Sequence, residues 1–149
     1  PTNKAYVDEL RARADGTDGR VTVHDPVPQP ELVRSLNRFD VGVYLLEPQT
    51  VNSRFALPNK IFDFLQARLG VVVGPSPEMA ALVRTTGAGT VADGFEAADL
   101  RRVLDDLGAD EVARWKDAAD GAATTYSAEN VVGVWSEAID AIVDRRGRA

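Results

Sequence analysis

Residues 52–74 read NSRFALPNKIFDFLQARLGVVVG, and this stretch decides the fold. A polar segment ends at Pro58, because proline removes a backbone donor and restricts the residue before it. Helical spacing of apolar side chains follows, at Ile61, Phe62 and Leu65. The pattern predicts a loop, a helix over residues 58–67 and a buried strand over residues 70–74. Junctions in which a loop enters a helix beside the carboxyl ends of parallel strands bind nucleotides and phosphates, so we expect a ligand site here.

The sequence on both sides of this stretch continues an alternation of strands and helices. Before it, apolar spacing and the positions of glycine and proline predict a helix (5–14), a strand (20–24), a proline-rich loop (25–28), a helix (29–39), a strand (40–46) and a loop (47–57). After it, they predict a helix (76–86) with Ser76 as its N-cap, a strand (89–92) and a helix (96–107). Such alternation is typical of an α/β fold with a Rossmann-like parallel sheet and helices on both faces.

From Asp110 onward the pattern changes to two helices, over residues 110–123 and 128–145, with no strand between them. The second helix has one apolar stripe, made by Val131, Val134, Trp135, Ala138, Ile139 and Ile142. We expect Trp115 and Trp135, which lie on helical stripes, to be packing residues. The chain therefore divides into a partial α/β domain, residues 1–109, and a helical extension, residues 110–149.

The composition excludes several classes of site. The 149 residues are 44% hydrophobic and 27% charged, which is normal for a soluble globular domain. A net charge of −6 argues against a nucleic-acid partner. The absence of cysteine excludes disulfides and thiolate metal sites, and a single histidine, His24, argues against a histidine-based zinc site. We reject His24 as a general base as well, because no carboxylate is placed to orient it.

The segment LPNKIFDFL at residues 57–65, followed by the valines at 71–73, resembles the donor-binding half of a GT-B glycosyltransferase. The group that it resembles is the large retaining family often called family 4. Other matching pieces occur in the same order as in that family, at residues 20–28, 31–41, 76–83 and 126–130. The resemblance implies transfer of a sugar from a nucleoside diphosphate sugar to a saccharide or lipid-linked acceptor. It also implies that the last helix packs on the same domain or across the interdomain cleft.

Two departures from the family pattern affect this interpretation. Many members carry two glutamates separated by seven residues; Asp63 occupies the second position and Phe55 the first, so the sugar-contacting acid is absent. The family's nucleotide domain also begins with a strand, a helix and a strand that are missing here, together with the N-terminal acceptor domain. Because the chain begins with Pro1, we expect it to be a piece of a longer protein that is inactive alone and contains no catalytic residue.

The missing strands would lie in the middle of the sheet, between the strands predicted at residues 20–24 and 40–46. Either a companion segment, meaning a piece of polypeptide outside this chain, fills the gap, or these two strands pair directly. We expect a companion segment, because a sheet without its centre exposes strand edges and apolar faces.

The resemblance and the residues together suggest roles in binding a nucleotide sugar. Asp63 would accept hydrogen bonds from the ribose hydroxyls; alternatively it is a helix acid that complements the helix dipole. Backbone N–H groups before this helix would point at phosphate or sugar oxygens, and the side chains of Asn52 and Ser53 would add hydrogen bonds. The residues that would supply these backbone groups are Asn52, Ser53, Arg54, Phe55, Ala56 and Leu57.

The remaining candidates have open alternatives. Arg54 and Lys60 would neutralise the departing diphosphate, or are solvated surface cations. Asn59 is a ligand or a helix cap. Val27, in the loop after the first predicted strand, would offer backbone groups to the base. No metal or other cofactor is expected, because no carboxylate pair marks a metal site and the family fold relies on cations and helix dipoles.

The resemblance places the intact enzyme in the cytoplasm, with peripheral association at the inner face of the membrane. A rival interpretation is a non-catalytic Rossmann-like nucleotide-binding or interaction domain, which the phenylalanine at position 55 fits. A third is a hydrolase or epimerase on the same scaffold. The sequence leaves open the base, the sugar, the acceptor, the stereochemical outcome and the oligomeric state.

Overall fold

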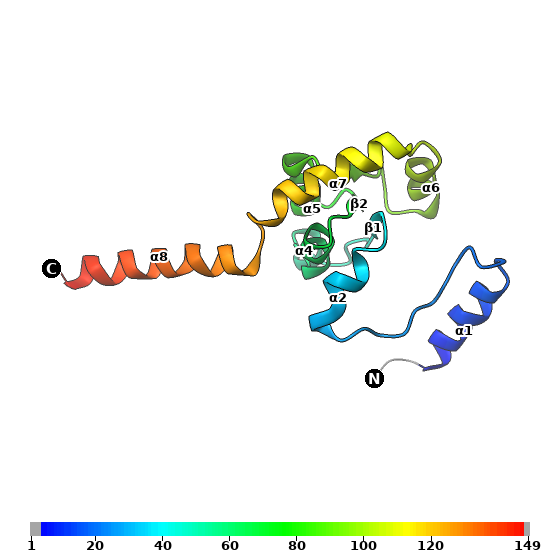
Figure 1. The fold of residues 1–149 in the computed structure, drawn as a ribbon, viewed down its shortest axis with the longest axis horizontal. Coiled ribbons are helices and arrows are strands. Elements are labelled where there is room, and N and C mark those ends of the chain that lie inside the picture. The colour runs from blue at the N-terminus through cyan, green and yellow to red at the C-terminus, as the bar shows by residue number, and fades with distance from the viewer. Residues whose placement is uncertain (1–3, 148–149) are drawn as a thin grey trace.

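The structure, a computed structural model, describes residues 4–147 and the surroundings of side chains up to residue 144. Figure 1 shows a small body of sheet and helices with a helical arm at each end of the chain. In chain order the elements are α1 (Lys4–Asp15), α2 (Gln29–Leu36), β1 (Val41–Tyr44), α3 (Val51–Arg54), α4 (Asn59–Gln66), β2 (Gly70–Val73), α5 (Pro77–Thr86), β3 (Gly89–Val91), α6 (Ala97–Asp105), α7 (Ala109–Ala123) and α8 (Ala128–Gly147).

The sheet has three parallel strands in the order β1-β2-β3. Hydrogen bonds from the Gly70 amide to the Asp40 carbonyl (2.9 Å) and from the Val71 amide to the Ala88 carbonyl (2.9 Å) tie β2 to both neighbours. Every residue of β2 is buried, as the continuous valine run predicts for a parallel strand covered on both faces. The α/β alternation predicted from residue 29 to residue 107 is therefore confirmed, and it produces a small parallel sheet with helices around it.

The core lies between β2 and the helices α4, α5 and α7. Ile61 and Leu65, one turn apart on α4, pack against the valines of β2, as predicted. Trp115 of α7 is 7% exposed and lies over Gly70, where an added Cβ would come within 2.9 Å of the indole ring. These contacts fix α4, the helix that carries the predicted site residues Asn59, Lys60 and Asp63.

The strand predicted at residues 20–24 does not form. Its β-branched residues favour extended backbone, but a strand also needs a neighbour to which it can hydrogen-bond. The connection from α1 to α2 instead runs apart from the sheet (Figure 1), and Val21 is 53% exposed. Direct pairing of this segment with β1 is therefore wrong, and β1 forms one edge of the three-stranded sheet.

Two local predictions are also corrected. The loop predicted at residues 47–57 contains the helix α3, which begins after Thr50 because the Thr50 and Ser53 side chains cap each other's backbone N–H groups. Ser76 precedes α5 as predicted, but its side chain makes no capping hydrogen bond, and its Oγ is buried with no partner in the described part of the chain.

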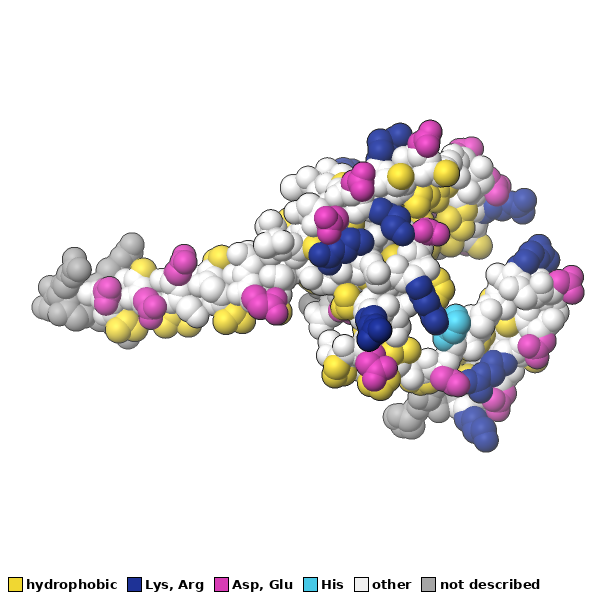
Figure 2. Space-filling model, in the orientation of Figure 1, with side chains coloured by type: hydrophobic (Ala, Val, Ile, Leu, Met, Phe, Trp, Pro, Cys, Tyr) yellow, Lys and Arg dark blue, Asp and Glu magenta, His cyan; other side chains and the backbone are white. Residues whose placement is uncertain are grey.

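The last helix, α8, projects from the body (Figure 1), whereas α7 packs on α4 and β2. Large apolar side chains on α8 are exposed, including Val131 (45%), Trp135 (66%) and Ile142 (57%). Figure 2 shows hydrophobic side chains at the surface along the length of this helix. Trp115 therefore packs as predicted, whereas Trp135 packs against nothing within the described residues.

Within residues 4–147, no helix is both long enough and apolar enough to cross a membrane.

Candidate functional site

The predicted site residues, with the exception of Val27, belong to one continuous segment after the carboxyl end of β1. The chain leaves β1 at Tyr44, turns through α3, and begins α4 at Asn59. Pro58 precedes α4 in extended conformation, so its fixed φ sets the direction in which the helix starts. No acidic residue lies in the first turn of α4, so no carboxylate in that turn offsets the positive charge at the start of the helix.

Asp63 lies one turn into α4 and is half-buried. Its backbone carbonyl accepts a hydrogen bond from the Ala67 amide (2.9 Å), as a helical residue should. Among the residues that the structure describes, its carboxylate has neither an ion-pair partner nor a hydrogen-bond donor. Lys60 is three residues earlier, so the two side chains leave α4 on neighbouring positions of one face without pairing with each other. The Asp63 carboxylate is thus available to a ligand.

The two predicted cations both lie on aromatic rings. Lys60 Nζ is 5.8 Å from the centroid of the Tyr44 ring, and the Arg54 guanidinium carbon is 5.7 Å from that of Phe55. Both distances are within the range of cation–π attraction. Neither cation has a carboxylate partner among the residues described in the structure. They are therefore solvent-exposed charges held by rings, and both have N–H groups available to an anion.

The segment from Asn52 to Leu57 offers fewer free donors than the sequence suggests. Hydrogen bonds within α3 and its ends already occupy the amides of four residues: Ser53 to Thr50 Oγ1 (3.1 Å), Arg54 to the Thr50 carbonyl (3.0 Å), Phe55 to the Val51 carbonyl (3.3 Å) and Ala56 to the Ser53 carbonyl (3.5 Å). The Ser53 hydroxyl takes part in the same capping box. Asn52 and Leu57, both exposed, remain the candidate amides of this segment.

Asn59 is the first residue of α4 and not its cap, because Pro58 occupies the capping position and no side chain caps the helix. It borders an open, mainly apolar hollow of about 330 Å³ lined also by Phe62, Tyr126, Ser127, Ala128 and Val131. The Phe62 and Tyr126 rings lie 6.1 Å apart in a tilted arrangement. This hollow joins the start of α4 to the start of α8.

The sequence did not assign Tyr44 or Tyr126 to the site. Tyr44 reads as one more apolar residue of a buried strand, and Tyr126 as part of the turn before a helix. Only the fold shows that the first lies under Lys60 and that the second faces Phe62. An aromatic residue at the end of a strand, followed by a lysine in the next helix, is a signal that could have suggested the first pair.

Val27 belongs to a different part of the fold, the irregular connection between α1 and α2, and is 38% exposed. His24 lies in the same connection, where its ring meets the edge of Phe39 with centroids 5.9 Å apart. Asp25 next to it pairs with Arg11 at 2.5 Å. Val27 and His24 therefore belong to a different segment from the site residues of α3 and α4.

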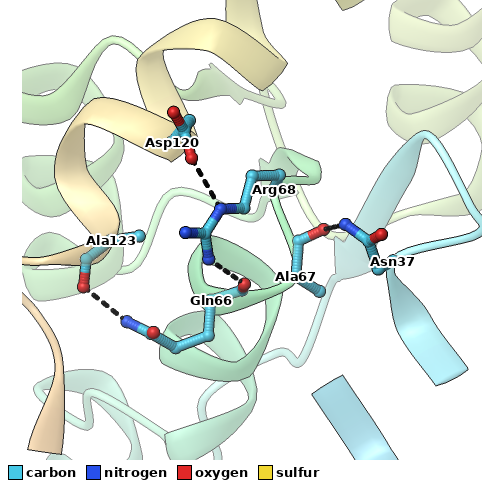
Figure 3. A network of polar contacts seen from close by, with 6 residues as sticks. All are labelled: Asn37, Gln66, Ala67, Arg68, Asp120 and Ala123. Atoms are coloured by element: carbon cyan, nitrogen blue, oxygen red, sulfur yellow. Dashed lines mark hydrogen bonds and ion pairs between the residues drawn. The ribbon is translucent and has the colours of Figure 1, made fainter. Parts of the chain in front are cut away.

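A polar network fixes the end of α4 opposite to the site (Figure 3). Arg68 Nε donates to Asp120 on α7 at 2.7 Å, and Gln66 Nε2 donates to the Ala123 carbonyl at 2.6 Å. Asn37, which follows α2, donates through Nδ2 to the Ala67 carbonyl at 2.8 Å. These bonds hold the carboxyl end of α4 against α7 and the end of α2, and so fix the position of its first turn.

No cluster of three or more histidine, aspartate or glutamate side chains in the described residues is arranged to hold a metal ion. No protein-family model matches the chain, and neither a curated protein nor a solved structure is similar enough to count as a match. The chemistry of the α4 segment therefore carries the functional argument.

Proposed function

We propose that this chain is part of the donor-binding half of a GT-B glycosyltransferase. The intact enzyme would be a retaining enzyme that transfers a sugar from a nucleoside diphosphate sugar to a saccharide or lipid-linked acceptor. The observation that supports this most is the first turn and a half of α4: Lys60 and Asp63 stand three residues apart beyond the carboxyl end of β1, and neither is neutralised by a neighbouring side chain. Ligands of open parallel sheets bind at that end of the strands.

The two charges suit the two halves of a nucleoside diphosphate. The Asp63 carboxylate would accept hydrogen bonds from the ribose hydroxyls, which carry no charge of their own. Lys60 and the positive end of α4 would face the diphosphate, whose negative charge grows as the bond to the sugar breaks. The acceptor hydroxyl that attacks the anomeric carbon would come from the domain on the other side of the cleft.

The exposed apolar surfaces fit a chain that is completed by other polypeptide. The strand β1 lies at an edge of the sheet, and Val43 within it and Leu46 just after it are 38% and 53% exposed. Parallel sheets occur almost only with both faces covered, and an open edge strand can pair with a further strand. Strands of a companion segment would add here, and the acceptor domain or the same domain would cover the stripe on α8. A lipid-linked acceptor would bring the intact enzyme to a membrane surface, which the family resemblance places at the cytoplasmic face.

One set of observations favours the rival, a non-catalytic Rossmann-like nucleotide-binding or interaction domain. Phe55 replaces the acid that contacts the sugar in many family members, and it is half-exposed at 51%. Four of the six amides predicted to hold the phosphate or sugar are used inside α3 and at its ends. A domain that had lost sugar transfer would tolerate both features.

Isothermal titration of the intact protein with UDP, GDP and ADP tests the proposal. We expect one of them to bind, and Asp63→Ala to weaken binding about tenfold or more, because it removes hydrogen bonds to a charged acceptor. Asp117→Ala is the matched control, since Asp117 is exposed on α7. Absence of binding, or equal affinity in the Asp63 variant and the wild type, would favour an interaction domain.

A further inference from the structure

Lys60 occupies an electrostatically unfavourable place. It lies in the first turn of α4, where the helix dipole already concentrates positive charge, and no acidic residue in that turn offsets it. Asp63 is within the usual reach of an ion pair three residues on, yet no such pair forms. The contact found for the ammonium group is the Tyr44 ring, 5.8 Å from Nζ.

Tyr44 is well suited to hold a charge in one place. It is the last residue of β1, and its carbonyl accepts the Gly74 amide at 3.3 Å, which ties the strand end to β2. Its half-buried ring packs against the hydrophobic core. The other ring of the segment, Phe55, is 51% exposed and has no comparable support. The Tyr44 ring is therefore a fixed surface, whereas the lysine above it has a flexible four-carbon stem.

We propose that Tyr44 is a positioning residue for anion binding, because its ring holds the Lys60 ammonium at the carboxyl end of β1, where that group meets a phosphate of the ligand. This inference rests on the proposed function. An ammonium group has three N–H donors, and contact with the ring on one side leaves donors free for phosphate oxygens on the other. Fixing the lysine before binding reduces the ordering that the ligand must impose, which is how preorganisation raises affinity.

The test is a double-mutant cycle between Tyr44 and Lys60 in the intact protein. The probes are inorganic pyrophosphate and the nucleoside diphosphates UDP, GDP and ADP, and the readout is the dissociation constant from titration calorimetry. We expect Tyr44→Leu to weaken binding about 2- to 5-fold, the range of an exposed cation–π contact. Tyr44→Phe keeps the aromatic face and should restore wild-type affinity. In a Lys60→Met background, Tyr44→Leu should have no further effect.

A matched control is Phe39→Leu, which removes a similar pair, Arg38 over the Phe39 ring at 5.2 Å, outside the α3–α4 segment. It should leave the dissociation constants unchanged. Equal losses from Tyr44→Leu with and without Lys60 would mean a structural role and would overturn the inference, as would full affinity in Tyr44→Leu or failure of Tyr44→Phe to restore it.

The two levels of the proposal fail differently. Binding of a nucleoside diphosphate without coupling between Tyr44 and Lys60 would overturn the role of Tyr44 and leave the proposed function intact. Binding of pyrophosphate with coupling, but of no nucleoside diphosphate, would support the role of Tyr44 and contradict the nucleotide site. Failure of the wild-type protein to bind any of the probes would contradict both.

Discussion

At the scale of single residues, close contacts decide which side chains the body accepts. Gly70 begins β2 under the indole of Trp115, where an added methyl group would come within 2.9 Å of ring carbon Cε3. Gly121, within α7, has no atom within 4 Å of the same position. Lack of space therefore requires a glycine at position 70, whereas nothing around position 121 requires one.

Gly70→Ala should lower the free energy of unfolding by about 1–3 kcal/mol, because a well-packed core responds to an extra methyl group by shifting its neighbours. Gly121→Ala should instead raise it by roughly 0.5–1 kcal/mol, since alanine is the better residue inside a helix. Urea denaturation followed by circular dichroism measures both. An unchanged stability of the Gly70 variant would mean that Trp115 does not pack on β2 as described.

Leu65 tests whether α4 packs into the core. It is 1% exposed and contributes, with Ile61, to the face of α4 that packs on the sheet. Leu65→Ala should cost about 2–5 kcal/mol, the usual range when a buried leucine is truncated and a cavity remains. The same denaturation experiment measures it, and a loss below about 1 kcal/mol would indicate that α4 is not seated in the core.

At the scale of elements, the connection between β1 and α4 combines a stiff turn with an open helix end. The helix α3 is only four residues long and rests on the reciprocal bonds of Thr50 and Ser53. The start of α4, in contrast, has no side-chain cap. The two helices of this segment therefore begin differently. Side chains cap the first backbone N–H groups of α3, whereas no side chain caps those of α4, which leaves them available to a ligand.

Removing the α3 cap should loosen this turn alone. Thr50→Ala deletes one partner of the capping box, which is worth about 1 kcal/mol, so the Ser53 amide should exchange its hydrogen about fivefold faster. Gln49→Ala is the control, because Gln49 is exposed and outside the capping box. Hydrogen exchange followed by NMR gives both rates, and equal rates in the two variants would contradict the capped α3.

The sequence predicts the body of this fold well because local signals and tertiary packing agree there. Proline before α4, helical spacing through Leu65 and the valine run of β2 each favour the structure that forms. The sequence does not predict α3, because a four-residue helix capped by one threonine and one serine has the composition of a loop. For the site, the sequence selects Asp63 and Lys60, but the ring under Lys60 depends on which strand end meets which helix.

At the scale of the whole molecule, the surface is the least predictable part. Residues 20–24 have the composition of a strand but find no neighbour, and the apolar stripe on α8 finds no cover within the described residues. Propensity and periodicity report what a segment can pair with; they do not show that the partner is in the same chain. Both features are what we expect if other polypeptide completes the fold, as proposed above.

If other polypeptide completes the fold, the isolated 149-residue chain should behave as an incomplete domain. With Trp135 and Ile142 more than half exposed and one sheet edge open at β1, the chain alone should self-associate or lose part of its structure. Light scattering coupled to gel filtration, with circular dichroism on the eluted peak, measures this. A well-folded monomer at all protein concentrations would remove the need for a companion segment.

If a nucleoside diphosphate binds at the start of α4, as proposed, hydrogen exchange mapped along the intact protein will locate it there. Bound UDP, GDP or ADP should slow exchange at the amides of Leu57 and of residues 59–63 and leave those of α6 (Ala97–Asp105) unchanged. At a nucleotide concentration near the wild-type dissociation constant, the slowing should be much smaller in Asp63→Ala and unchanged in Asp117→Ala. Nucleotide protection that maps elsewhere, or that is equal in both variants, would contradict the account.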